Sequence, residues 1–397
     1  MFILSLSENI LLFVSLFGVL QGFLLAGLLY FHPKSDRSVN KFLAMYITCL
    51  CIIMLGPLIL LLIPWHKVFF MEPFTYLAGP LMYLYIRSYK EAITWRKALP
   101  HIIPFFLYFF VSYWWLSYLI SKYAASSQPP EEAFTTTLAI FLVLIRYGQL
   151  VLYYFMSRRQ LIVYQRSIEQ LFSETSRIDL KWVRWLINGY IIIVITTIVL
   201  YPLMLNYQEH FDLLYLINVV IATPYIYLIA YKGITQPTIW QVKTATGKEV
   251  IEEQMQRSEE IEKEIHEKQK IQKTGLNDSR INEIVAKIIA LMNKEKLYQE
   301  TELTLQDLAK KLDYPSHQVS QAINEGMKKN FYDLINSYRV EEAKSLLLNP
   351  KNTNYTILSV GFEAGFNSKT TFNTVFKKFT GLTPTEFKDE NSLKVPA

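Results

Sequence analysis

Two groups of short polar and basic side chains near the C-terminus have the residue types that hydrogen bond to nucleic acid. The first group lies within residues 303–324 and the second within residues 355–384. Amide, hydroxyl and imidazole groups can match base edges in the major groove, and lysines can match phosphates. The predicted DNA-contacting residues are His317, Ser320, Gln321, Asn324, Lys369, Thr370, Asn373, Thr374, Lys377 and Lys378.

The first group is carried by a helix-turn-helix pattern. Thr304 and Asp307 form a T-x-x-D helix start, and a turn is expected at Asp313–Tyr314. A second helix follows this turn, and its polar face is expected to lie on the outside. The residues predicted to face inward are Leu305, Leu308, Ala309, Leu312, Val319 and Ile323.

A second helix-turn-helix pattern carries the second group. Gly365 and Phe366 are expected to make its turn, Ser368 to cap the following helix, and Gly381 to end that helix before Pro384. Lys369, Thr370, Asn373 and Thr374 then point outward, with Lys377 and Lys378 placed for phosphates. The residues predicted to face the core are Ile357, Val360, Gly361, Ala364, Phe372, Val375, Phe376 and Phe379.

Residues 331–348 lie between the two patterns and are strongly helical in composition. Eighteen residues of α-helix span roughly 27 Å. One turn of DNA is about 34 Å. We therefore expect this helix to hold the two patterns where they can reach successive major grooves on one face of double-stranded DNA.

The region from about 285 to 390 resembles the AraC/XylS family of bacterial regulators. The resemblance rests on the LxxLA run, on NSYRVEEA (336–343), on the GF turn, on FKK (376–378) and on GLTP. It implies that the second helix of each pattern is a recognition helix. Pro315 stands where the family usually has a Ser or Thr cap, which shifts the expected cap to Ser316. Gly361 replaces a usual alanine.

The charge of this region is low for a DNA-binding domain. From Ser279 to the end, 16 Lys and Arg face 14 Asp and Glu, a net charge of +2. Because phosphate neutralisation supplies much of the affinity for DNA, we expect a monomer to bind weakly. A homodimer, formed through the connector or the DNA-binding domain, is the expected partner on DNA.

The N-terminal part of the chain is far more apolar than the rest. Hydrophobic residues make up 51% of the chain and charged residues only 19%, and the apolar excess lies before residue 233. A membrane-spanning helix needs about 20 mostly apolar residues. Seven stretches meet this need: 8–31, 42–64, 68–89, 99–121, 133–157, 182–205 and 211–231.

Basic residues predict the orientation of these spans. Loops one, three and five hold Lys and Arg, whereas the alternate loops hold only Lys67 and Lys122. By the positive-inside rule, the N-terminus lies outside the bacterial cytoplasmic (inner) membrane and the C-terminal domain lies in the cytoplasm. The basic loop residues are Lys34, Arg37, Lys41, Lys90, Arg96, Lys97, Arg158, Arg159, Arg166, Arg177 and Lys181.

A charged residue within the fifth span has two interpretations. Arg146 lies near its middle, Gln149 is one turn away, and Glu72 is the one acid clearly within a span. An intramembrane charge is costly and faces the interior or a polar cavity. Arg146 could line a cavity for an unknown signal ligand with an anionic group, or it could be structural, satisfied by carbonyls and tyrosines.

The sequence thus predicts an all-α protein with three parts. Residues 1–232 form a multi-pass, seven-helix transmembrane bundle in the lipid bilayer, 233–280 a charged helical connector, and 281–397 the double helix-turn-helix domain. Lys248–Lys270 is either a solvated charged helix or a short dimeric coiled coil. The architecture is similar to membrane-bound AraC-type regulators.

Catalytic and metal-binding motifs are not evident in the sequence. HExxH, GxSxG and phosphate-binding glycine patterns do not occur, and Cys49 and Cys51 lie in an apolar run. We expect no enzyme activity, no metal and no cofactor. The favoured function is a membrane sensor that regulates transcription. The alternative is a transporter-like or receptor-like membrane protein whose helical tail binds a protein partner.

Overall fold

The computed structural model describes residues 6–31, 37–60, 72–123, 137–176, 178–206, 211–235, 278–352 and 354–392. Within these ranges the chain forms fourteen α-helices and no strand, so it is all-α as predicted. A single antiparallel bridge joins Phe172 to Thr304. The chain divides into two compact units, one of residues 1–164 and 180–252 and the other of residues 165–179 and 253–397. The three-part domain division stays a prediction.

The first unit is built mostly from long apolar helices, and each predicted span overlaps one helix. Five of these helices are long and apolar enough to cross a membrane over their described residues. The described apolar part of the first, Ser15–Phe31, is shorter, and α4 has 14 residues. The helices are α1 (Leu6–Phe31), α2 (Arg37–Leu60), α4 (Thr75–Ser88), α5 (Trp95–Tyr123), α7 (Thr137–Leu171), α8 (Lys181–Asn206) and α9 (Phe211–Thr235).

The first unit has large apolar side chains on its surface and hydroxyl groups inside. Phe110 and Trp114 of α5 are 65% and 66% exposed. In the interior, the hydroxyls of Tyr46 and Tyr225 lie 2.9 Å apart, and Tyr225 also donates to the carbonyl of Leu186 at 2.9 Å. An apolar outer surface of this extent is unfavourable in water, whereas lipid chains would cover it.

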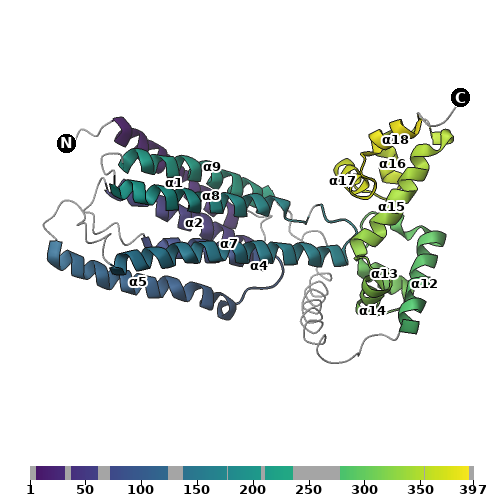
Figure 1. The fold of residues 1–397 in the computed structure, drawn as a ribbon, viewed down its shortest axis with the longest axis horizontal. Coiled ribbons are helices and arrows are strands. Elements are labelled where there is room, and N and C mark those ends of the chain that lie inside the picture. Colours follow the sequence, from purple (N-terminus) through teal and green to yellow (C-terminus); the bar gives the residue numbers. More distant parts are fainter. Residues whose placement is uncertain are drawn as a thin grey trace. The chain divides into compact units, whose positions relative to one another are not determined.

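The second unit places its helices around α15, with α12 to α14 toward one end and α16 to α18 toward the other (Figure 1). Helix α15 packs against α16, α17 and α18, and also against the short helices η3 and η4. The elements are α12 (Asp278–Glu295), η3 (Leu297–Gln299), α13 (Leu305–Leu312), α14 (Ser316–Gln321), η4 (Ala322–Gly326), α15 (Phe331–Leu348), α16 (Ile357–Glu363), α17 (Lys369–Thr380) and α18 (Pro384–Ser392).

The helix ends follow the predicted capping residues. Thr304 accepts from the amide of Asp307, and the carboxylate of Asp307 accepts from the amide of Thr304, which completes a capping box. Ser368 caps α17 by accepting from the amide of Thr371 at 3.1 Å. Gly381 ends α17 with φ +82°, a left-handed conformation that glycine adopts without strain. These predictions are confirmed.

Two local expectations are wrong. Pro315 itself is the N-cap of α14 and makes no side-chain capping bond, and Ser316 is already the first helical residue. Phe379 is 36% exposed instead of facing the core. Helix α14 is followed by a π-helix at Ala322–Gly326, a feature that was not predicted. The Lys248–Lys270 segment lies outside the described residues.

Candidate DNA-binding surface

Helix α14 and the π-turn after it present the first predicted polar face. His317 and Asn324 are exposed, while Ser320 and Gln321 are half-buried. The buried side of the same helix holds Val319, as predicted. The four polar residues therefore lie on the side of the helix that the core does not cover.

A carboxylate on this face was not predicted. Glu325, which is exposed, accepts a hydrogen bond from Gln321 Nε2 at 3.1 Å. Asn324 Nδ2 donates to Ser320 Oγ at 3.4 Å. The sequence signal was the i, i+4 spacing of Gln321 and Glu325. The amides that would read bases are thus engaged within the helix before DNA arrives.

Helix α17 presents the second polar face. Lys369, Thr370 and Thr374 are exposed and Asn373 is half-buried, whereas Thr371 is buried. Phe372, Val375 and Phe376 are fully buried against α15 and α16. The 3.6-residue period thus separates a polar stripe from an apolar one, and the polar stripe begins at the N-terminus of the helix.

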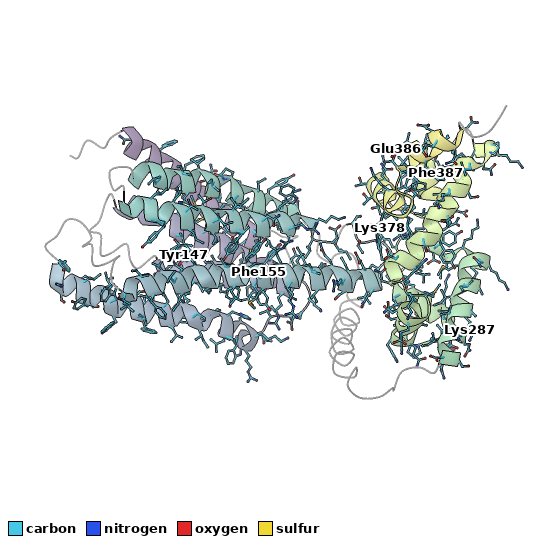
Figure 2. The ribbon with its side chains drawn as sticks, viewed as in Figure 1. Tyr147, Phe155, Lys287, Lys378, Glu386 and Phe387 are labelled. Carbon is cyan, nitrogen blue, oxygen red and sulfur yellow. The ribbon has the colours of Figure 1, made fainter. Side chains whose placement is uncertain are left out.

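The two lysines at the end of α17 differ in their surroundings. Lys377 is exposed. Lys378 is labelled in Figure 2. Its Nζ lies 2.7 Å from Asp333 Oδ1 in α15 and 5.5 Å from the centre of the Tyr332 ring. The charge of Lys378 is therefore partly neutralised by α15, which leaves Lys377 better placed to attract a phosphate.

A buried arginine connects the parts that carry the two faces. Arg339 of α15 is 0% exposed, and its Nε donates to the carbonyl of Tyr298 at 2.7 Å. Its Nη2 donates to the carbonyl of Glu300 at 2.7 Å. Burial lowers the pKa of Arg339 to about 10, and nearby Glu174 acts in the opposite direction. The guanidinium thus holds the chain between α12 and α13 against α15.

The role of Arg339 was not predicted, although its position gave a signal. Arg339 lies four residues after Ile335 and four before Ala343, both fully buried, so it occupies the apolar stripe of its own helix. A charged residue on such a stripe must find several hydrogen-bond acceptors. Backbone carbonyls supply them here, and which carbonyls do so depends on the tertiary fold.

The turn of the second pattern packs closely on the first half of the unit. Gly365 has φ +96°, and a Cβ there would lie 2.7 Å from both the Tyr298 carbonyl oxygen and Gln299 Cα. Only glycine fits this conformation and this spacing. Gly361 is explained similarly, because a Cβ there would lie 2.7 Å from the ring of Phe372.

The predicted signal residues lie in the first unit. Arg146 is 6% exposed, and its guanidinium lies 5.7 Å from the centre of the Tyr201 ring in α8. Gln149 Nε2 donates to the carbonyl of Tyr76 at 3.0 Å, so it connects α7 to α4. The side chain of Glu72 lies outside the described residues. Arg146 and Gln149 of α7 therefore contact α8 and α4, respectively.

Metal ligands do not gather in the part of the chain that the structure describes. No group of three or more His, Cys, Asp or Glu residues there could hold a metal ion. Cys49 and Cys51 are free and buried, and Cys49 Sγ donates to the carbonyl of Phe74 at 3.0 Å.

Comparison with known proteins supports the same region. A family model described as a helix-turn-helix domain matches residues 294–390. Uncharacterised HTH-type transcriptional regulators of Staphylococcus aureus, from strains COL and MSSA476, are each 27% identical to this chain over 115 residues. Each match covers 29% of this chain and 14% of the relative, so the chain shares one domain with them. No solved structure matches the chain. Residues 294–390 are therefore an AraC-type helix-turn-helix domain.

Proposed function

We propose that this protein is a membrane-tethered transcription regulator that binds specific sequences in double-stranded DNA. The observation that carries the proposal is the pair of outward polar faces, one on α14 and one on α17, joined by α15. Each face lies opposite a buried apolar side. A protein-binding helix more often presents an apolar stripe to its partner, so this arrangement favours nucleic acid.

Membrane attachment is supported by the first unit. Its long apolar helices expose large hydrophobic side chains and bury tyrosine hydroxyls. The asymmetry of basic loops supports an orientation with the N-terminus outside and the DNA-binding domain in the cytoplasm of a bacterium. A regulator held in the inner membrane would then reach chromosomal DNA directly.

Pairing on DNA is part of the proposal. The net charge of +2 from Ser279 onward is small, and Lys296, Lys311 and Lys378 form ion pairs with carboxylates of the same unit. Fewer lysine charges are then available to phosphates, which weakens binding that depends on counterion release. Two copies on adjacent sites would compensate by doubling the number of contacts.

A signal would act through the helices of the first unit. Arg146 is buried beside Tyr201, and we infer that an anionic group of a ligand or lipid competes for this guanidinium. Such a ligand shifts the bundle only if it binds two arrangements of α7 and α8 unequally.

The test is a genome-wide occupancy map of the tagged full-length protein in its membrane. Sequence-specific binding predicts sharp sites with a shared motif, and the double variant Lys369→Ala/Asn373→Ala should lose them. The matched control, Lys344→Ala/Lys351→Ala, removes two lysines outside the two polar faces and should keep the sites. A map without enriched sites for the parent protein, together with a stable protein complex on the tail, would support the alternative of a protein-binding tail.

A further inference from the structure

The loop between α7 and α8 contributes a short strand-like segment to the second unit. Ser173 donates from its amide to the carbonyl of Leu303 at 3.2 Å and from its hydroxyl to the same carbonyl at 2.7 Å. Phe172 and Thr304 form the antiparallel bridge beside it. We call residues 172–174 the docking segment. It pairs with the residues that begin the first helix-turn-helix pattern.

The docking segment also satisfies the buried polar groups of α15. The carbonyl of Ser173 accepts from Asn336 Nδ2 at 3.0 Å and from Arg339 Nη1 at 3.5 Å. Arg339 Nη2 donates to Ser173 Oγ at 3.3 Å. All three residues are 0% exposed. Removing the segment would leave donors of a buried amide and a buried guanidinium without these acceptors, which is unfavourable unless water or another group replaces them.

A third contact reaches the recognition helix of the second pattern. Glu174 Oε1 lies 3.5 Å from Thr371 Oγ1 in the first turn of α17. Burial, followed by the charge of Glu174, raises the pKa of Tyr332 in α15. The docking segment therefore touches the first pattern, the linking helix and the second pattern within three consecutive residues.

This position is the joint between the two DNA-reading halves. Arg339 binds Ser173 together with the carbonyls of Tyr298 and Glu300, and Gly365 of the second pattern packs on Tyr298. A change at Ser173 therefore acts on residues that fix how the first and second patterns are placed about α15. Their spacing decides whether both can enter successive major grooves.

The ends of the loop are also held in place, by a hydrogen bond and by burial. Gln165 Nε2 in α7 donates to the carbonyl of Asp179 at 2.8 Å, and Ile168, Leu171 and Ile178 are buried. Helix α7 runs without interruption from Thr137 to Leu171, so Arg146 and the docking segment belong to one continuous element and its end. The docking segment follows directly on the last residue of α7, Leu171.

We propose that the docking segment is an internal coupling element that holds the two helix-turn-helix patterns in their DNA-competent arrangement. A membrane signal controls DNA binding by moving α7 and so seating or withdrawing Ser173. This route is separate from the connector of residues 233–280. Its role in regulation rests on the proposed function, whereas the docking itself does not.

Docking can be tested by disulfide formation in the full-length protein in native membranes, with Cys49 and Cys51 replaced by alanine. Bridged antiparallel residues have Cα atoms about 4.5–5.5 Å apart, which a disulfide can span. Phe172→Cys/Thr304→Cys should cross-link readily on mild oxidation. The control pair, Ser176→Cys/Thr304→Cys, uses an exposed position four residues after Phe172 and should not cross-link. Equal or absent cross-linking in both pairs would overturn the docking.

The regulatory step is tested by matched substitutions in the full chain. Ser173→Leu places a large side chain in a fully buried site and should withdraw the segment, whereas Ser176→Leu adds the same side chain at an exposed site. Occupancy of chromosomal sites should fall roughly tenfold or more in the first variant only, a change of about 1.4 kcal/mol. Oxidised Phe172→Cys/Thr304→Cys protein in lipid nanodiscs should bind those sites as tightly as the parent.

The results separate the two proposals. Specific cross-linking without any chromosomal sites for the parent protein would reject the proposed function and keep the docking. Loss of DNA binding in the oxidised pair, or unchanged occupancy in Ser173→Leu, would reject the coupling and keep the proposed function. Two controls exclude a variant that fails to fold. The abundance of each variant in the membrane is measured by immunoblot, and Phe172→Cys/Thr304→Cys is cross-linked in the otherwise unchanged protein.

Discussion

Gln321 Nε2 donates a hydrogen bond to Glu325 Oε2 at 3.1 Å on the exposed side of the first recognition helix. Gln321 is a predicted base-contacting residue, and Glu325 adds a negative charge where DNA phosphates would approach. Glu325 lies in the π-turn that ends this helix. The hydrogen bond therefore occupies the Gln321 amide, and the charge of Glu325 opposes nonspecific attraction of the protein to DNA.

Replacing Glu325 by glutamine should strengthen DNA binding. The substitution removes the charge and keeps the side-chain length, so we expect a several-fold rise in affinity with weaker discrimination between sites. Binding would be measured with nanodisc-embedded protein at several salt concentrations. Glu390→Gln, an equal charge change at an exposed position in α18, serves as the control. Equal effects of both variants would contradict a local role for Glu325.

Lys377 and Lys378 should contribute unequally to DNA affinity. Lys377→Ala is expected to reduce the salt dependence of binding by about one phosphate contact. Lys378→Ala should change it less, because Asp333 lies 2.7 Å from Lys378 Nζ. Loss of this partly exposed ion pair should lower stability by under about 1 kcal/mol. Salt titrations of both variants provide the comparison, and a larger slope change for Lys378→Ala would refute the assignment.

Gly365→Ala should destabilise the second unit more than Gly381→Ala. Both glycines have positive φ, so both substitutions carry a backbone penalty of about 1 kcal/mol. At Gly365 the new Cβ also meets the backbone of Tyr298 and Gln299, whereas Gly381 has open space. Proteolysis rates of the second unit in the full-length protein would rank the two substitutions. Equal resistance would show that this turn does not pack as described.

Arg146→Leu should abolish the response to the membrane signal while leaving the protein in the membrane. The guanidinium of Arg146 is buried beside Tyr201 of α8. Arg146 itself lies in α7, which continues to the docking segment. Arg158→Leu, at an exposed position of the same helix, is the control. The readout is a reporter fused to a promoter from the occupancy map, with growth conditions screened for induction. Normal induction in Arg146→Leu would remove Arg146 from signalling and leave it a structural role.

Much of the second unit could be predicted from local sequence because local interactions decide it. The capping box at Thr304 and Asp307, the cap at Ser368 and the stop at Gly381 involve residues within a few positions of one another. Helix α15 has the limits that its composition predicts, Phe331–Leu348. The apolar spacing also identified most of the buried faces, with Phe379 as the exception.

Long-range contacts could not be predicted in this way. The sequence identified Arg339 as part of a motif string, but its acceptors lie at Tyr298, Glu300 and Ser173, far from it along the chain. Lys378 likewise appeared free for phosphate until α15 brought Asp333 to it. Hydrogen-bond and ion-pair partners of this kind depend on which surfaces the fold brings together, and a single sequence does not show which surfaces these are.

The residues themselves determined that this chain would have an apolar helical part and two polar recognition faces, because hydrophobic periodicity and capping act over one or two helical turns. Tertiary structure alone decided that Asp333 pairs with Lys378 and that Ser173 enters the joint between the two patterns. The physical reason is that a buried charged or amide group takes whichever acceptor the packed chain supplies, and that acceptor lay 166 positions away from Arg339.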